Sequence, residues 1–368
     1  MYLKYLKAKD FRNYSAIDIQ CSERINIFFG RNAQGKTNLL EAITLLGHGR
    51  SFRTKKDQEL IRWGTEACFL RGDFDSSATE SRVEIGIGVD TKKSKIDGRP
   101  VKNNELLGQI PLVIFSPDDL QIVKGGPQHR RDFIDFYLVQ IDPGYRYVYY
   151  NYHQVLQQRN RLLKDNRPDQ EQMEVWSEQL VEKGSKVIRY RIQFLNEAQP
   201  YINRAQFRIS GNVEELSLSY LGFHDQALAS ADEEQLQTVF RRELERLRTA
   251  ELCRQVTLVG PHRDDLRIAL GTGMELRSFG SQGQQRTAVL ALKIGLLEKI
   301  RETRGVYPIL LLDDVMSEFD DLRKQQLLEL LLEGSQTFLT STGRRDFPIE
   351  SSLSRFFEVE QGIVANVL

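Results

Sequence analysis

The chain has 368 residues, which is too long for one compact core and suits two domains. Hydrophobic residues make up 40% of it and charged residues 28%, as in ordinary globular proteins. Lys plus Arg and Asp plus Glu both number 51, so the formal net charge is zero. The molecule as a whole therefore does not attract a polyanion, and any such ligand must be bound through a local patch.

The cysteine positions and the length of the apolar runs indicate in which cellular compartment the protein is expected. The three cysteines are far apart and form no Cys-x-x-Cys pair, which argues against a disulfide framework or a zinc site and favours a reducing cytoplasm. We expect no signal peptide, because Lys4, Lys7 and Lys9 interrupt the start of the chain. No apolar run is long enough to span a bilayer, so we expect no membrane association.

The first 29 residues read as strands, with a polar segment from Lys9 to Tyr14 between them. Arg12 lies in that polar segment, and on the sequence alone a plain surface charge is its simplest interpretation. The last of these strands, Ile25–Phe29, is short and rich in β-branched and aromatic residues, as buried strands are.

A glycine-rich turn follows that strand. The run Gly30-Arg31-Asn32-Ala33-Gln34-Gly35-Lys36-Thr37 fits the phosphate-binding pattern of Gly, four residues and Gly-Lys-Thr, and residues at helical spacing come next. A strand, a glycine turn and a helix place backbone N–H groups and a helix N-terminus around phosphate oxygens. Lys36 is then expected to contact the β- and γ-phosphates, and Thr37 to ligate Mg²⁺. The sequence therefore predicts a site for a nucleoside triphosphate with Mg²⁺.

A basic loop comes after the predicted helix. Four cations fall within seven residues, and contact with phosphate and simple solvation fit this pattern equally well: Arg50, Arg53, Lys55 and Lys56. Beyond the loop, alternation between Cys68 and Val89 predicts a meander of strands, and Asp97-Gly98 predicts a hairpin turn. Leu112–Phe115 is a further buried strand.

From about Asp119 to Arg254 the pattern is mainly helical and predicts an antiparallel bundle. One helix is rich in tyrosine, and its helical spacing favours core packing over stacking on bases. Strands return at Gln255–Val259 and Leu266–Leu270. We therefore predict an α/β fold with one discontinuous domain, residues 1–118 plus 255–368, that carries a helical lobe of residues 119–254 as an insertion.

Two further motifs lie near the C-terminus. The apolar strand Ile309–Leu312 ends in Asp313-Asp314, where Asp313 is expected to hold Mg²⁺ through water and Asp314 to orient or deprotonate an attacking water. Before it, Ser281-Gln282-Gly283-Gln284 stands where a glycine turn opens a helix. This is the second anion-binding geometry in the chain.

The phosphate loop, the Ser281–Gln284 motif and the acidic strand occur in the order typical of ATP-binding-cassette ATPases, which the chain resembles. Within that superfamily it resembles the RecF family of bacterial DNA replication and recombinational-repair proteins. The motifs that carry this resemblance are Phe11-Arg12-Asn13-Tyr14, Pro117-Asp118-Asp119-Leu120, Gly125-Gly126-Pro127, Arg130-Arg131, Gly260-Pro261-His262-Arg263-Asp264 and Gly280 to Thr287.

The resemblance implies roles for particular residues. Ser281, Gln282, Gly283 and Gln284 would contact the γ-phosphate held by a second protomer, so that ATP closes a head-to-tail homodimer. Lys36, Ser281 and Asp314 would act in catalysis, Arg12 would approach the nucleotide, and Ser317-Glu318-Phe319-Asp320 would couple the two sites. The chain departs from the general cassette pattern at Gln336–Thr342, which lacks the usual switch histidine, and at Asp314, where most members use glutamate.

The resemblance also implies a function. It predicts ATP-dependent binding to single-stranded, gapped or duplex DNA in repair and replication restart, with slow, DNA-stimulated ATP hydrolysis as a switch. RecR and RecO would be its partners in loading recombinase at gaps, and SOS induction would depend on it. DNA contacts are expected at the basic loop and at Arg130 and Arg131. The alternatives are an ATP-gated regulatory scaffold and a transporter ATPase subunit, although the helical insertion is too long for the latter.

Overall fold

The computed structural model describes residues 1–75, 80–165, 169–211, 214–223, 226–227, 232–315, 334–343 and 354–367. It divides into two compact units, of which the first comprises Met1–Asp119 and Leu297–Leu368 and the second Leu120–Leu296. The expected coupling loop Ser317–Asp320 lies outside the described residues. Within the described part of the chain, no helix is both long and apolar enough to cross a membrane.

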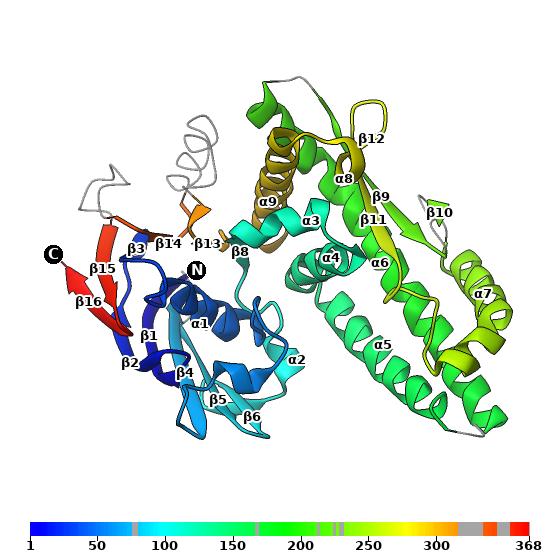
Figure 1. The fold of residues 1–368 in the computed structure, drawn as a ribbon, viewed down its shortest axis with the longest axis horizontal. Helices are drawn as coiled ribbons and strands as arrows, with labels where there is room; N and C mark the ends of the chain where they lie inside the picture. Colours follow the sequence, from blue (N-terminus) through cyan, green and yellow to red (C-terminus); the bar gives the residue numbers. More distant parts are fainter. Residues whose placement is uncertain are drawn as a thin grey trace. The chain divides into compact units, whose positions relative to one another are not determined.

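The first unit contains an antiparallel sheet with the strand order β2-β1-β4-β5-β6-β7 (Figure 1). Every second residue of β4 is buried, so one face of the sheet points into the core. Asp97 and Gly98 have φ of 51° and 79° and join β6 to β7, which confirms the predicted hairpin turn. The strands are β1 (Tyr2–Phe11), β2 (Tyr14–Gln20), β4 (Ala67–Asp75), β5 (Glu80–Gly88), β6 (Lys92–Ile96) and β7 (Arg99–Val101).

The second sheet of this unit has the order β16-β15-β3-β14-β13-β8 and is parallel from β15 to β8. Its central strands are buried almost throughout, as expected for a parallel sheet covered on both faces. The predicted strands at 25–29, 112–115 and 309–312 are thus confirmed. The strands are β3 (Ile25–Phe29), β8 (Leu112–Phe115), β13 (Ile309–Leu312), β14 (Thr337–Ser341), β15 (Ser354–Glu360) and β16 (Ile363–Val367).

Helix α1 (Lys36–His48) contacts β4 and β5 of the antiparallel sheet and β14 of the parallel one. Because it packs against both sheets, it is buried on nearly all sides, Glu41 and Thr44 included. It starts directly after the phosphate loop and ends at Gly49, whose φ is 68°. The short helices of the unit are η1 (Asp57–Leu60), α2 (Asn103–Leu106) and η2 (Pro117–Leu120).

The second unit combines helices with a small sheet of order β10-β9-β11-β12. Helices α5 and α6 run side by side (Figure 1), and α6 also contacts α7 and β9. Tyr145 and Tyr152 of α5 are buried, which confirms core packing for these tyrosines. The elements are α3 (Gln121–Lys124), α4 (Pro127–Ile141), α5 (Pro143–Leu162), α6 (Gln170–Ser210), β9 (Leu216–Gly222), β10 (Gln226–Ala227), α7 (Glu233–Arg254), β11 (Asp265–Leu270), β12 (Met274–Glu275) and α8 (Leu276–Phe279). Helix α9 (Gln282–Arg304) begins in this unit, and its residues from Leu297 on belong to the first unit.

One expectation about this region is wrong. The segment Gln255–Val259 is not a strand, because the N–H groups of Thr257 and Leu258 bond to the side chains of Asn160 and Glu251 instead of a neighbouring strand. The predicted helical region also contains β9, which pairs with β11. That pairing draws the segment from 255 to 296 into the second unit, whereas the sequence pattern places it in the ATPase domain.

The three cysteines carry free thiols. Cys21 and Cys68 are buried, and burial raises the pKa of each thiol to about 12. Because the thiolate is the reactive form, both side chains serve as small apolar core groups. Cys253 is exposed on α7.

Candidate nucleotide-binding site

The phosphate loop runs from the end of β3 to the first turn of α1. Gly30, Ala33 and Gly35 have φ of 154°, 63° and 110°, so the backbone turns sharply at three of its positions. A Cβ on Gly35 would lie 2.5 Å from the side-chain amide nitrogen of Asn13. Together with the positive φ, this close approach explains why glycine is needed there. Among the described residues, no side chain caps the N-terminus of α1, so its N–H groups face the loop as an anion-binding site.

Lys36 is only 5% exposed and folds back over the loop. Its Nζ donates hydrogen bonds of 2.6 and 3.0 Å to the carbonyl oxygens of Gly30 and Arg31. These bonds hold the ammonium inside the curve of the loop, at the head of the helix. A phosphate group in the loop would meet this buried cation together with the helix N-terminus.

Thr37 and Asp313 meet across the parallel sheet. The Thr37 Oγ1 donates a 2.8 Å hydrogen bond to Asp313 Oδ1, and Thr340 Oγ1 donates one of 3.0 Å to the same oxygen. The register explains the contact, since β14 pairs with both β3 and β13 and all three strands end at one edge. Burial raises the pKa of Asp313, and the two hydroxyl hydrogen bonds oppose that shift.

These oxygens fit Mg²⁺, which takes hard oxygen ligands and usually combines one or two protein ligands with water and phosphate oxygens. Asp314 follows Asp313 at a φ of 51°, and its N–H donates a 2.8 Å hydrogen bond to Thr340 Oγ1. Thr340, which lies in the segment expected at the switch position, therefore contacts both aspartates. The other end of that segment is structural, because buried Gln336 bonds to the backbone of Leu3 and Ser22.

The Ser281–Gln284 motif lies in the second unit, at the start of α9. Ser281 N donates to Gln284 Oε1 at 3.0 Å, and Gln284 N donates to Ser281 Oγ at 3.2 Å, which is a reciprocal cap. Gln284 also donates to Glu214 at 3.1 Å. Ser281, Gln282 and Gly283 remain exposed, so this helix start is open to a ligand or a partner.

The chain is similar to known proteins over nearly its whole length. A family model described as "RecF/RecN/SMC N terminal domain" matches residues 2–365. The chain is 39% identical to the DNA replication and repair protein RecF of Halothermothrix orenii over 99% of this chain and 98% of that protein. It is 41% identical to RecF of Symbiobacterium thermophilum, again over 99% and 98%. The chain belongs to the RecF family.

Solved structures confirm the predicted ATPase-head fold. The structure described as the recombination mediator protein RecF-ATP in the RecFOR pathway matches with a TM-score of 0.91 and 36% identity, over 100% of this chain and 98% of that one. An Smc head bound to the C-winged helix domain of ScpA matches at 14% identity with a TM-score of 0.56, over 100% and 97%. The latter likeness concerns the fold alone and shows the SMC-like head architecture.

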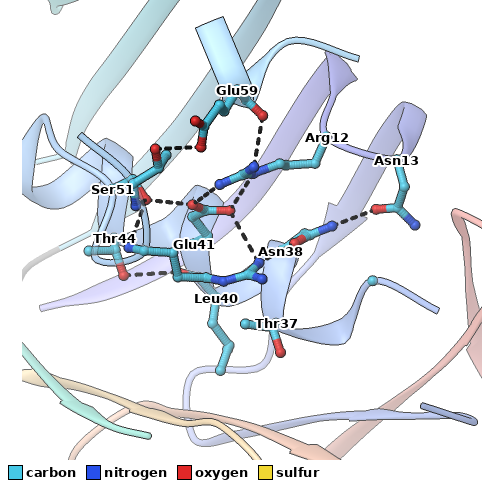
Figure 2. A network of polar contacts seen from close by, with 12 residues as sticks. Arg12, Asn13, Thr37, Asn38, Leu40, Glu41, Thr44, Ser51 and Glu59 are labelled. Atoms are coloured by element: carbon cyan, nitrogen blue, oxygen red, sulfur yellow. Dashed lines mark hydrogen bonds and ion pairs between the residues drawn. The ribbon is translucent and has the colours of Figure 1, made fainter. Parts of the chain in front are cut away.

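In this RecF family member, Arg12 is tied to α1. Its Nε and Nη2 donate to the two carboxylate oxygens of Glu41 at 2.8 and 2.6 Å, and its Nη1 donates to the carbonyl of Glu59 at 2.8 Å (Figure 2). Next to it, Asn13 donates to the Gln34 carbonyl of the phosphate loop at 2.9 Å and accepts from Asn38 at 2.8 Å. Asn13 therefore braces the side of the phosphate loop, while the Arg12 guanidinium is engaged with Glu41 and Glu59 in this structure.

The residues expected to contact DNA fall into two groups. Arg50, Arg53, Lys55 and Lys56 are exposed on the loop after α1, as a phosphate contact requires. Arg130 is only 3% exposed and forms a fork with Asp265, with bonds of 2.6 and 2.8 Å. Arg131 donates to the carbonyl of Asp264 at 2.6 Å. The expectation for Arg130 is wrong because its side chain is buried in that fork, whereas a DNA contact at Arg131 stays a prediction.

Sequence reasoning assigned no role to Asn13, Asn38, Glu41 and Thr340, which contact the phosphate loop, its helix or the acidic strand. Glu41 left a signal, because it lies between the apolar pairs Leu39-Leu40 and Ala42-Ile43 of the predicted helix. A charged residue at a position that helical spacing buries must have a partner. Thr340 left no signal of its own, because a threonine inside an apolar strand is common.

Proposed function

We propose that this RecF family member is an ATP-dependent DNA-binding protein of recombinational repair and replication restart. The observation that carries the proposal is the Thr37–Asp313 contact, because it brings a phosphate-loop hydroxyl and a strand-end carboxylate to one point. Relatives named RecF-ATP and RecF-ATPrS share 36% identity with this chain over its full length, which supports ATP as the nucleotide.

In this proposal the loop N–H groups, the start of α1 and the Lys36 ammonium bind the phosphates of ATP. Thr37 ligates Mg²⁺ directly and Asp313 holds it through water. The bound metal supplies charge neutralisation at the phosphates. The exposed loop residues Arg31, Asn32 and Ala33 leave the approach to this site open.

Hydrolysis requires a group that orients the attacking water, and we assign that role to Asp314. Its N–H donates a hydrogen bond to Thr340 Oγ1, which holds the backbone of Asp314 directly after Asp313. Aspartate is shorter than the glutamate of most cassette ATPases, which fits slow turnover. ATP would then act as a switch that is set by binding and released by hydrolysis.

A second copy of the chain would complete the site. The exposed Ser281 and the start of α9 offer a second anion-binding point, which belongs to the second unit, whereas the phosphate loop belongs to the first. We infer that it contacts the γ-phosphate held by the partner protomer in a head-to-tail homodimer. ATP would thus control dimerisation, and the dimer would present two copies of the basic loop to one DNA.

The partners follow from the same relatives, whose description places them in the RecFOR pathway. We propose that this chain acts in the cytoplasm with RecR and RecO at single-strand gaps and supports SOS induction. Membership of the RecF family argues against the transporter ATPase subunit. A regulatory scaffold that binds ATP without using its hydrolysis differs from our proposal in one measurable property, the turnover of ATP on DNA.

The test measures binding of a labelled gapped DNA by the full chain with ATP, with ADP and without nucleotide, and ATP turnover with and without that DNA. We expect tight binding only with ATP, and turnover that is slow and increases with DNA. DNA binding that ignores the nucleotide contradicts the proposal. ATP-dependent binding without any turnover favours the scaffold.

A further inference from the structure

The loop from Arg50 to Lys56 carries four exposed cations, yet buried side chains fix its backbone. Glu41 of α1 has a fully buried side chain, and the Ser51 hydroxyl donates a 2.5 Å hydrogen bond to its Oε1 (Figure 2). Arg53 lies 3.8 Å from the other carboxylate oxygen and donates a 2.7 Å bond to Asn38. The middle of the loop is therefore anchored to the helix that begins at the phosphate loop.

The Ser51 hydroxyl passes this anchor on to the loop backbone. Its oxygen accepts hydrogen bonds from the N–H groups of Arg53 at 2.9 Å and Thr54 at 3.1 Å. Thr54 in turn accepts a 3.1 Å bond from the N–H of Lys56 and donates one of 2.6 Å to Glu59. A continuous series of side-chain to backbone bonds thus runs from Glu41 to Lys56 and determines the path of the loop.

The base of the loop is closed by a second buried charge. Lys92 of β6 has a side chain only 9% exposed, and its Nζ donates to the Gly49 carbonyl at 2.8 Å and to Asp57 Oδ1 at 2.9 Å. Gly49 precedes the loop and Asp57 follows it, so one ammonium joins its two ends. The nucleotide site uses neither this ammonium nor the bond between Glu41 and Ser51.

We propose that Glu41 and Lys92 are positioning residues that hold the Arg50–Lys56 loop as a preformed site for the phosphate backbone of DNA. A loop whose path is fixed loses little conformational freedom on binding, so its cations bind phosphate more tightly than those of a flexible loop. Two of the neighbouring carboxylates also contact loop cations, because Glu41 lies 3.8 Å from Arg53 and Glu59 lies 3.9 Å from Lys56. Both carboxylates are also held by other groups, Glu41 by Arg12 and Glu59 by Thr54. The inference rests on the DNA binding proposed above and assigns that binding a built surface.

The test titrates a labelled plain duplex with the full-length protein and ATP at several salt concentrations. Ser51→Ala removes the link to Glu41, Ser51→Thr keeps the hydroxyl, and Lys92→Met removes the clamp at the base. Lys55→Glu/Lys56→Glu reports the contribution of the loop cations themselves. We expect Ser51→Ala and Lys92→Met to weaken binding and to flatten the slope of log affinity against log salt by about 0.9 for each phosphate that the loop no longer neutralises. Ser51→Thr should bind like the wild type.

A fluorescent ATP analogue serves as the folding control, and Ser51→Ala should bind it with unchanged affinity. If Lys92→Met fails to fold, the pair Ser51→Ala and Ser51→Thr decides the question. Wild-type affinity and slope in Ser51→Ala, with weakened binding by the double charge reversal, overturn the positioning role and leave the proposed function standing. Wild-type binding by the charge reversal removes the loop from the DNA interface and overturns the inference. A wild-type protein that does not bind DNA removes the proposed function as well.

Discussion

Thr37 Oγ1 and Asp313 Oδ1 lie 2.8 Å apart, although 276 positions separate the two residues in the chain. The parallel register of β3, β14 and β13 makes this meeting possible, because β14 joins the strand before the phosphate loop to the strand before the aspartates. Thr340 of β14 bonds to the same carboxylate oxygen. The edge at which we propose that the metal binds thus depends on three strands.

Thr37→Ala should weaken Mg²⁺-dependent ATP binding, because it removes the hydroxyl that we propose as a metal ligand and leaves the phosphate loop intact. Thr37→Ser keeps the hydroxyl and should bind like the wild type. Nucleotide affinity measured across a Mg²⁺ titration checks this. Equal Mg²⁺ dependence in Thr37→Ala and wild type would show that the hydroxyl is not a metal ligand.

Asp314→Asn should keep ATP binding and slow turnover by about 10²-fold or more, the usual contribution of a general base. The ATP-bound dimer should persist longer, because release follows hydrolysis. Single-turnover hydrolysis of labelled ATP gives the rate directly, with Asp313→Asn as the comparison that also weakens metal binding. Turnover at the wild-type rate in Asp314→Asn would place the base elsewhere.

Arg130→Gln should destabilise the second unit, because it leaves Asp265 without its fork of hydrogen bonds. Breaking a buried ion pair costs about 3 kcal/mol or more of unfolding free energy. Urea unfolding measures that loss. Because Arg130 is buried, the salt slope of DNA binding should not change in conditions where the variant is folded. A flattened slope with unchanged stability would restore Arg130 as a phosphate contact.

His262 makes the second unit sensitive to acid. Its Nδ1 lies 2.5 Å from the Tyr152 hydroxyl, and burial lowers its pKa from 6.5 to about 3. The folded state keeps the ring neutral, while the unfolded chain takes up a proton below about pH 6.5. The stability that the neutral ring contributes is therefore complete above pH 6.5 and is lost as the pH falls toward 3.

Asp264 acts in the opposite direction, because burial raises its pKa from 3.8 to about 6 and its contribution is lost as the pH rises through that range. Comparing His262→Gln with wild type separates the two. The variant should be less stable at pH 7, and the gap should shrink by about 1.4 kcal/mol per pH unit below pH 6.5. Urea unfolding at pH 7, 6 and 5 measures the gap. A constant gap would mean that the pKa of His262 is not lowered.

The sequence predicted the elements whose signal is local. The phosphate loop, the strand before Asp313 and the hairpin at Asp97-Gly98 all carry strong short-range patterns, and the structure has each of them. The strand predicted at Gln255–Val259 does not form, because backbone N–H groups of this segment bond to the side chains of Asn160 and Glu251. The burial of Arg130 likewise depends on Asp265, a partner 135 positions away. Contacts with side chains outside a segment produce no periodic pattern of apolar residues within it.

The central claim is that ATP held at Lys36 closes two copies of the chain into a dimer. Sedimentation of the wild type, Lys36→Ala and Ser281→Arg, each with and without ATP, tests it most directly. We expect ATP to dimerise the wild type alone. We also expect that Ser281→Arg stays monomeric while still binding ATP, and that gapped DNA strengthens the wild-type dimer. A Ser281→Arg protein that dimerises with ATP like the wild type, or a wild-type protein that stays monomeric with ATP and gapped DNA, would contradict the claim.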